Sequence, residues 1–250
     1  MEVRDYDDII NKALQLDTLE SLNDAFQICR KLEIKDGVTV RDAKTGNESF
    51  IYDEDNFRKA HIYNRMIRTR AKQRMKDGGL KAAMQYRRCL LFDAPHDFDS
   101  FCIYLEMDRE PSKKFYIPRR KQLLPLVEAL QELETGDLNI LGISLPPGVG
   151  KTTLAIFFLC WISGRRPEMQ SLIGSHNNDF LRGVYDECLR IMHGNGEYLW
   201  SDVFPATRIV NTNAKDMRID LGTKKRFQTL EFSSIGSGNA GRILPGIAVM

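Results

Sequence analysis

The chain has 250 residues, 42% of them hydrophobic, so it can bury a core and is not intrinsically disordered. Its formal net charge of +2 excludes a uniformly basic nucleic-acid-binding protein, and any such contact must come from local clusters. The five cysteines are odd in number and scattered, which is typical of a reducing cytosol and not of a disulfide framework or a zinc site.

Residues 1–112 are expected to form a mainly helical N-terminal region with one small hairpin. Apolar residues recur at helical spacing in several stretches, with Asp17 and Glu20 as a capping pair in the first of them. These helical stretches are residues 7–33, 55–76, 80–92 and 97–107. The runs 38–40 and 49–52 flank a turn-rich stretch and predict the hairpin.

The predicted helix over residues 55–76 carries a local positive charge. Its segment 58–76 contains eight lysines and arginines and no carboxylate. Two interpretations remain open. The cluster could attract a DNA backbone, with an affinity that falls steeply with salt, or it could be a solvated face that acidic residues of the same region neutralise.

From residue 113 the pattern changes to alternating helices and strands. A second basic cluster lies at residues 113–121, inside or just before a helix that Gly136 is placed to cap. A strand at 139–145, a helix at 153–163, a strand at 171–175 and a helix at 178–193 follow in that order. This order predicts an α/β domain over residues 113–250 with a parallel sheet.

The last fifty residues predict further strands. Residues 218–221 and 227–233 form a predicted hairpin, and the glycine-rich stretch 236–241 is a predicted loop. The apolar residues 247–250 predict the start of another buried strand.

The segment from Leu145 to Thr153 has the residue types of a phosphate-binding loop. Gly148 and Gly150 lack a Cβ and allow positive φ, so that successive N–H groups can point at an anion. The ammonium of Lys151 can reach the β- and γ-phosphates, and Thr152 Oγ1 can bind Mg²⁺. The site is therefore expected to bind a nucleoside triphosphate, with magnesium. The expected contacts are Pro147, Gly148, Val149, Gly150, Lys151, Thr152 and Thr153.

The loop departs from the general pattern at its first position. The motif G-x-x-x-x-G-K-[ST] asks for glycine where this chain has Leu145. Pro146 and Pro147 stiffen the entry to the loop and remove N–H groups that are not needed there. The alternative is a glycine-rich strand-to-helix turn that binds no ligand.

A magnesium-dependent NTPase also needs an acidic residue at the end of a neighbouring strand. The candidates in this chain fall in helical, loop or hairpin contexts. They are Asp186, Glu187, Asp202, Asp216 and Asp220. The expectation is therefore either a fragment that stops within that strand or a protein that binds nucleotide without efficient turnover.

Together with the loop, several segments resemble the ATPase domain of tailed-phage terminase large subunits, the ATPases of DNA packaging. These segments are residues 115–122, 174–176, 198–205, 211–216 and 236–241. The resemblance covers residues 113–250 and implies an ASCE-type P-loop ATPase fold, with Lys151 and Thr152 as phosphate and magnesium ligands. The acidic pair and the nuclease domain of that family are absent, so packaging and cleavage are not assigned to this chain alone.

The resemblance also implies partners and two weaker site residues. The implied partners are double-stranded DNA, a small terminase subunit, a portal protein and further copies of the chain. Gln122 is a candidate for contact with the adenine edge, or else a surface glutamine. Arg182 is a candidate for stabilising γ-phosphate charge, or else a solvated helix residue.

The leading hypothesis is an ATPase with ATP and Mg²⁺ as cofactors that couples hydrolysis to DNA packaging. A nucleotide-binding regulatory module without turnover is the alternative, and a helicase- or AAA-like ATPase is a third possibility. The N-terminus lacks a signal sequence, and the apolar run 154–162 is too short to cross a bilayer. A soluble cytoplasmic protein is therefore expected.

Overall fold

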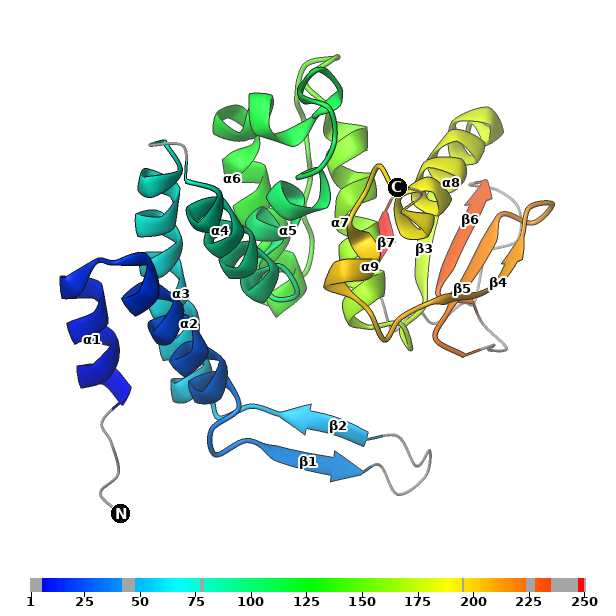
Figure 1. The fold of residues 1–250 in the computed structure, drawn as a ribbon. Coiled ribbons are helices and arrows are strands. Elements are labelled where there is room, and N and C mark those ends of the chain that lie inside the picture. The colour runs from blue at the N-terminus through cyan, green and yellow to red at the C-terminus, as the bar shows by residue number, and fades with distance from the viewer. Residues whose placement is uncertain are drawn as a thin grey trace. The chain divides into compact units, whose positions relative to one another are not determined.

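The computed structural model describes residues 6–41, 48–76, 79–194, 196–223, 228–234 and 247–249. The chain divides into two compact units, Met1–Asp93 and Ala94–Met250 (Figure 1). The sequence predicted the boundary after residue 112, but helix α5 (Phe98–Leu105) packs within the second unit. Its Phe98 ring lies 5.3 Å from the ring of Phe158.

Four helices and a hairpin make up the described part of the first unit. The helices are α1 (Tyr6–Leu16), α2 (Leu19–Glu33), α3 (Glu54–Met75) and α4 (Leu80–Asp93). Apolar side chains that recur at helical spacing form one core, including Leu22, Phe26 and Ile67. The predicted helices are confirmed, and residues 7–33 form two of them.

The predicted hairpin is also confirmed. Strands β1 (Val38–Arg41) and β2 (Glu48–Ile51) pair in antiparallel fashion, and every residue in them is exposed. The turn predicted between them lies outside the described residues.

The capping pair predicted at Asp17 and Glu20 is wrong. The N-cap of α2 is Thr18, whose hydroxyl accepts from the N–H of Ser21 at 3.1 Å. The Ser21 hydroxyl in turn accepts from the N–H of Thr18, which completes a capping box in which serine takes the usual glutamate position.

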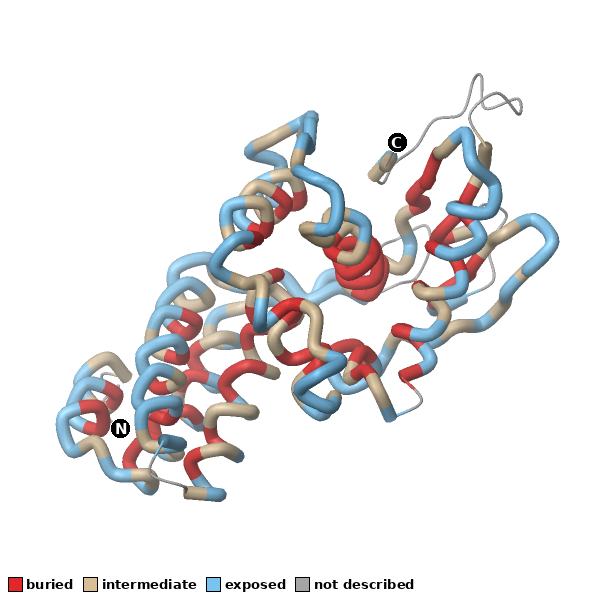
Figure 2. The backbone as a smooth tube through the Cα atoms, turned by 90° about the horizontal axis from the view of Figure 1, so that it is seen from above, coloured by how far each residue is buried: buried red, intermediate tan, exposed pale blue. Residues whose placement is uncertain are grey.

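The second unit contains the remaining helices. They are α5, the short 3₁₀ helix η1 (Pro111–Lys113), α6 (Tyr116–Thr135), α7 (Lys151–Arg165), α8 (Asn178–His193) and α9 (Trp200–Val203). Helix α6 ends at Gly136, whose φ of 90° lies in the left-handed region, as predicted. Helix α7 is buried at every position from Ile156 to Gly164 (Figure 2).

Both tryptophans are fixed in this core by their indole N–H groups. Trp161 Nε1 donates to the carbonyl of Ala94 at 2.9 Å, and Trp200 Nε1 donates to the carbonyl of Cys160 at 2.8 Å. Each indole is therefore buried with its polar atom satisfied, which avoids the penalty of an unpaired buried donor.

The sheet of the second unit has the order β4-β5-β6-β3-β7 among the described residues. Its strands are β3 (Ser171–Ser175), β4 (Ile209–Asn213), β5 (Arg218–Leu221), β6 (Leu230–Ser234) and β7 (Ala248–Val249). Strand β3 is parallel to β6 and β7, whereas β5 is antiparallel to β4 and β6. The fold is thus mixed α/β, with the predicted parallel pairing between β3, β6 and β7. The hairpin predicted for residues 218–221 and 227–233 is found as the antiparallel pair of β5 and β6.

The strand predicted at residues 139–145 is wrong. This segment is irregular in the structure, and Ile140 is 88% exposed. A strand needs a neighbour that accepts and donates main-chain hydrogen bonds, and none of the described strands pairs with this segment. The apolar pattern of residues 139–145 therefore did not suffice to predict a strand, because it carries no information about a neighbouring strand.

None of the helices that the structure describes has the length and apolar content of a bilayer-spanning segment. All five cysteines are buried and unpaired. Burial raises the pKa of the Cys89 thiol to about 12, so this thiol stays protonated at neutral pH.

Candidate functional site

The glycine-rich loop takes the backbone conformation that its composition predicts. A turn over residues 147–149 leads into α7, with Gly150 as its N-cap. Gly148 and Gly150 have φ values of 80° and 102°, which residues with a Cβ rarely adopt. Because α7 begins at Lys151, two residues before the predicted start, its free N–H groups lie in the loop itself.

The two glycines are required for different reasons. A Cβ on Gly148 would meet nothing within 4 Å, so this position faces open space and is limited by backbone conformation alone. A Cβ on Gly150 would lie 2.2 Å from Cε2 of Phe115. The Phe115 ring is therefore packed directly on the loop.

Lys151 lies across the loop in this structure. Its ammonium donates a hydrogen bond to the carbonyl of Leu145, at the other end of the turn. No carboxylate in the described part of the chain forms an ion pair with it. The Lys151 ammonium is thus held beside the N-terminus of α7 by a neutral acceptor, the Leu145 carbonyl. An anion could take the place of this carbonyl as the partner of Lys151.

A cavity of about 350 Å³ opens next to Lys151 and Thr152. Strands β3 and β7 contribute Ser175 and Val249 near their carboxyl ends, and α8 contributes Phe180. Ligands of open α/β sheets bind at the carboxyl ends of parallel strands, so the loop and the cavity are placed at the expected edge. Thr152 is exposed and Thr153 is half-buried, and the magnesium contact of Thr152 stays a prediction.

The candidate acidic residues do not reach this cavity. Asp186 and Glu187 belong to α8, Asp202 belongs to α9, and Asp216 lies in the turn after β4. Asp220 lies in β5, fully buried, and accepts from the Asn211 amide at 3.2 Å. None of the described residues lining the cavity is aspartate or glutamate.

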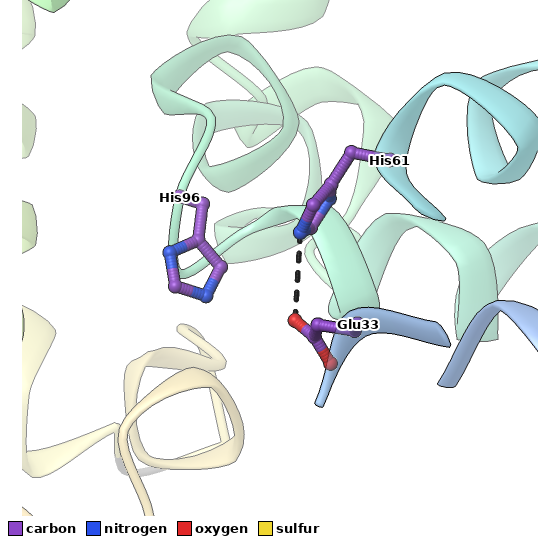
Figure 3. Close-up of side chains that lie close together, drawn as sticks. All are labelled: Glu33, His61 and His96. Atoms are coloured by element: carbon purple, nitrogen blue, oxygen red, sulfur yellow. Dashed lines mark ion pairs between the residues drawn. The ribbon is translucent and has the colours of Figure 1, made fainter. Parts of the chain in front are cut away.

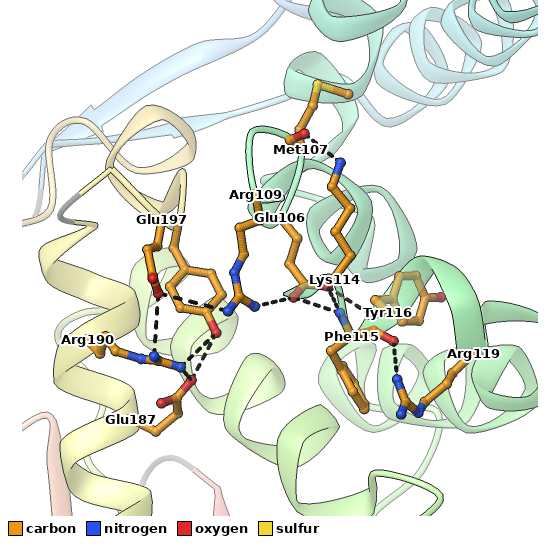
Figure 4. Close-up of polar contacts among 11 residues, drawn as sticks. Glu106, Met107, Arg109, Lys114, Phe115, Tyr116, Arg119, Glu187, Arg190 and Glu197 are labelled. Atoms are coloured by element: carbon orange, nitrogen blue, oxygen red, sulfur yellow. Dashed lines mark hydrogen bonds and ion pairs between the residues drawn. The ribbon is translucent and has the colours of Figure 1, made fainter. Parts of the chain in front are cut away.

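Phe115 supports the loop and is itself held at several points (Figure 4). Its N–H donates to both carboxylate oxygens of Glu106 at 3.0 Å, and its carbonyl accepts from Arg119 at 3.2 Å. The Arg119 guanidinium also lies 5.3 Å from the centre of the ring. Sequence reasoning assigned no role to Phe115, because its contact with Gly150 is tertiary and no local pattern signals it.

Glu106 is a second residue that the sequence did not single out. It is fully buried, and a buried carboxylate is destabilising unless it is paired. Arg109 Nη1 lies 2.6 Å from Oε1, and the N–H of Tyr116 donates to Oε2 at 2.8 Å. Since Phe115 and Tyr116 open α6, the carboxylate also lies at the positive end of that helix dipole.

The second basic cluster is largely engaged within the unit. Arg120 forms a bidentate pair with Asp99, with both distances 2.8 Å. Lys113 lies 3.5 Å from Glu110, and Lys114 donates to the carbonyl of Met107. This cluster therefore presents less positive charge to solvent than its sequence suggests.

Gln122 and Arg182 remain predictions. Gln122 is exposed on α6 and is not among the residues that line the cavity. The Arg182 guanidinium donates to the carbonyl of Ala214, in the turn between β4 and β5. Phe180 and Val184 of the same helix line the cavity, whereas Arg182 does not.

The basic helix α3 of the first unit meets carboxylates of the same unit. Lys59 lies 3.0 Å from Asp7, and Arg74 lies 3.3 Å from Asp17. Arg68 lies 3.2 Å from the buried Asp93. These pairs support the interpretation of a neutralised face.

His61 extends this set of charges into the interior of the first unit. Its Nδ1 lies 2.8 Å from Asp93. Its Nε2 lies 3.4 Å from Glu33, the ion pair drawn in Figure 3. Burial alone would lower the pKa of His61, but the hydrogen bonds with Asp93 and Glu33 outweigh it and raise the pKa.

Comparison of the chain with protein-family models, curated proteins and solved structures gave no match.

Proposed function

We propose that this chain binds ATP with Mg²⁺ at the loop 145–153 and forms the ATP-binding motor portion of a terminase large subunit. ATP hydrolysis would then drive packaging of double-stranded DNA. The observation that carries the nucleotide site is the pair of glycines at positive φ immediately before α7, with Lys151 as its first residue. The terminase assignment rests on the sequence resemblance.

The chemistry of the loop favours a triphosphate over a smaller anion. Main-chain N–H groups at the start of α7 and the Lys151 ammonium supply donors and positive charge over a distance of several ångströms. The Thr152 hydroxyl beside them is exposed and suits a hard cation such as Mg²⁺. A phosphate chain with bound magnesium uses all three features together.

A nucleotide-binding module without turnover is the second candidate. It is favoured by the cavity beside Lys151, whose described lining has no carboxylate to orient a metal ion and an attacking water. The two candidates share the same binding site and differ only in turnover.

Titration calorimetry with MgATP tests the site. Lys151→Ala should weaken binding by about a hundredfold or more, as expected for loss of a charge-assisted contact to phosphate. Lys12→Ala, an exposed lysine of α1 in the first unit, is the matched control and should leave the affinity unchanged. Equal MgATP affinity of wild type and Lys151→Ala would refute the site.

Phosphate release separates the two candidates. Steady ATP hydrolysis that Lys151→Ala abolishes would favour the motor, and binding without hydrolysis would favour the regulatory module. Stimulation by double-stranded DNA that disappears at raised salt would support packaging. Association with a small terminase subunit, with a portal protein and with further copies of the chain forms part of the same proposal.

A further inference from the structure

The aromatic ring of Phe115 packs against the loop at Gly150. The Phe115 ring occupies the space that a side chain on Gly150 would need, with Cε2 and Cζ within 2.2 and 2.5 Å of the missing Cβ. The ring also meets Phe157 of α7, at 5.7 Å between ring centres in an edge-to-face arrangement. The ring thus fills the angle between the loop and the helix that follows it.

The backbone of Phe115 is fixed by a buried charge. Glu106 has no solvent exposure, and its two oxygens accept from the N–H groups of Phe115 and Tyr116. Hydrogen bonds to a buried ionised acceptor are among the stronger ones in proteins. Movement of Phe115 would therefore leave carboxylate lone pairs unsatisfied in the interior, which is unfavourable.

We infer that Phe115 is a positioning residue for the phosphate-binding loop and that Glu106 is its anchor. The ring holds Gly150 in its left-handed conformation before any ligand arrives, so the N–H groups at the start of α7 are already directed at the anion site. Pre-organisation of this kind increases affinity because less ordering is left to the binding step. The inference rests on the proposed nucleotide site, and it adds a residue that touches the loop without touching phosphate.

The network around Glu106 has a buried half and an exposed half. Arg109, which pairs with Glu106, also lies 3.9 Å from the Glu197 carboxylate. Arg190 of α8 lies 3.4 Å from that Glu197 carboxylate. The side chains of Glu197 and Arg190 are 42% and 48% exposed, so that pair contributes little. The positioning effect is therefore assigned to Glu106, and Glu197 offers a matched control in the same network.

The test measures the loop without ligand as well as with it. Amide hydrogen exchange of residues 145–153 is followed in the ligand-free protein, and MgATP affinity is measured by calorimetry. Phe115→Ala and Glu106→Gln should each raise exchange in the loop and weaken MgATP binding by about tenfold, the effect of losing modest pre-organisation. In Glu106→Gln an amide N–H₂ replaces one carboxylate oxygen. This donor then faces the N–H groups of Phe115 and Tyr116, which are donors themselves. Phe115→Leu should show a smaller effect of the same kind.

The controls separate positioning from general destabilisation. Glu197→Gln should change neither loop exchange nor affinity. Strand β3, residues 171–175, should keep its exchange rates in every variant, whereas a merely structural role would raise them together with those of the loop. Unchanged loop exchange in Phe115→Ala would overturn the inference, even if MgATP binds. If wild type does not bind MgATP, the proposed function fails, and the exchange measurement still decides whether Phe115 orders the loop.

Discussion

The cations along α3 and Lys151, the first residue of α7, have different kinds of partner. In α3, cations along the helix meet carboxylates of the same unit, as in the pairs Lys59–Asp7 and Arg68–Asp93. In α7 the first residue is a lysine that meets a main-chain carbonyl, with no carboxylate among the described residues that line the neighbouring cavity. The difference teaches that the number of cations in a segment says little about ligand binding, and that the partners of each cation decide its role.

The largest expected effect concerns the buried pairs of α3 and α4. Asp93→Asn removes the charge that meets both His61 and Arg68, and it should lower the stability of the first unit by about 3–5 kcal/mol, because two largely buried cations lose a shared carboxylate. Hydrogen exchange of the α2 and α3 amides measures this loss.

Asp55→Asn is the matched control for this prediction. It removes an ion pair with Arg58 in which both side chains are mostly exposed, and it should change stability by less than about 1 kcal/mol. Equal effects of the two substitutions would contradict the assignment of the α3 charges to the fold.

The second prediction concerns the two loop glycines. Gly148→Ala should destabilise the second unit by about 1–2 kcal/mol, because only the left-handed backbone is strained. Gly150→Ala should add a further ~1–3 kcal/mol, because its Cβ collides with the Phe115 ring. Urea unfolding of both variants measures the difference, and equal losses would argue against the packing of Phe115 on the loop.

The third prediction is a pH dependence confined to the first unit. The pKa of His61 is raised in the folded protein, so its protonated form stabilises the fold. This contribution is complete below the ordinary value of 6.5 and is lost as the pH rises through the higher folded pKa. Hydrogen exchange of α3 amides should therefore quicken from pH 6.5 upward beyond the intrinsic rate increase. His61→Gln should abolish this additional increase in exchange. If the additional increase stays unchanged in that variant, the prediction is contradicted.

The smallest effect is expected for the outer lysines of α3. Lys72 and Lys76 are exposed, and their replacement by alanine should change any affinity of the chain for double-stranded DNA by less than about twofold. Filter binding over a series of salt concentrations measures both affinity and its salt dependence. If each substitution instead reduced the slope of log affinity against log salt concentration by about one unit, α3 would be identified as a DNA-binding face.

The sequence predicted those elements whose signals are local. Helix α8 has an asparagine N-cap and an apolar stripe, and α6 ends at a glycine, so the start of α8 and the end of α6 could be located. The positive φ of the loop glycines could also be predicted from the sequence, because few other residues adopt positive φ.

The errors came from features that depend on a partner elsewhere in the chain. Residues 139–145 have the composition of a strand but lack a paired neighbour among the described strands. Strand β4 was missed because polar residues occupy three of its five positions and none of the five is fully buried. The roles of Phe115 and Glu106 depend on tertiary contacts with Gly150 and with α6, which no spacing in the sequence encodes.

Both tryptophans of the chain, Trp161 and Trp200, are buried in the second unit. Excitation of indole therefore reports on the unit that carries the loop, while the first unit contributes only tyrosine and phenylalanine. A change in the emission maximum during denaturation would follow the opening of the core around α7, whatever happens to α1–α4. Intrinsic fluorescence and far-ultraviolet circular dichroism, recorded on one sample, would consequently reveal whether the two units unfold together or in sequence.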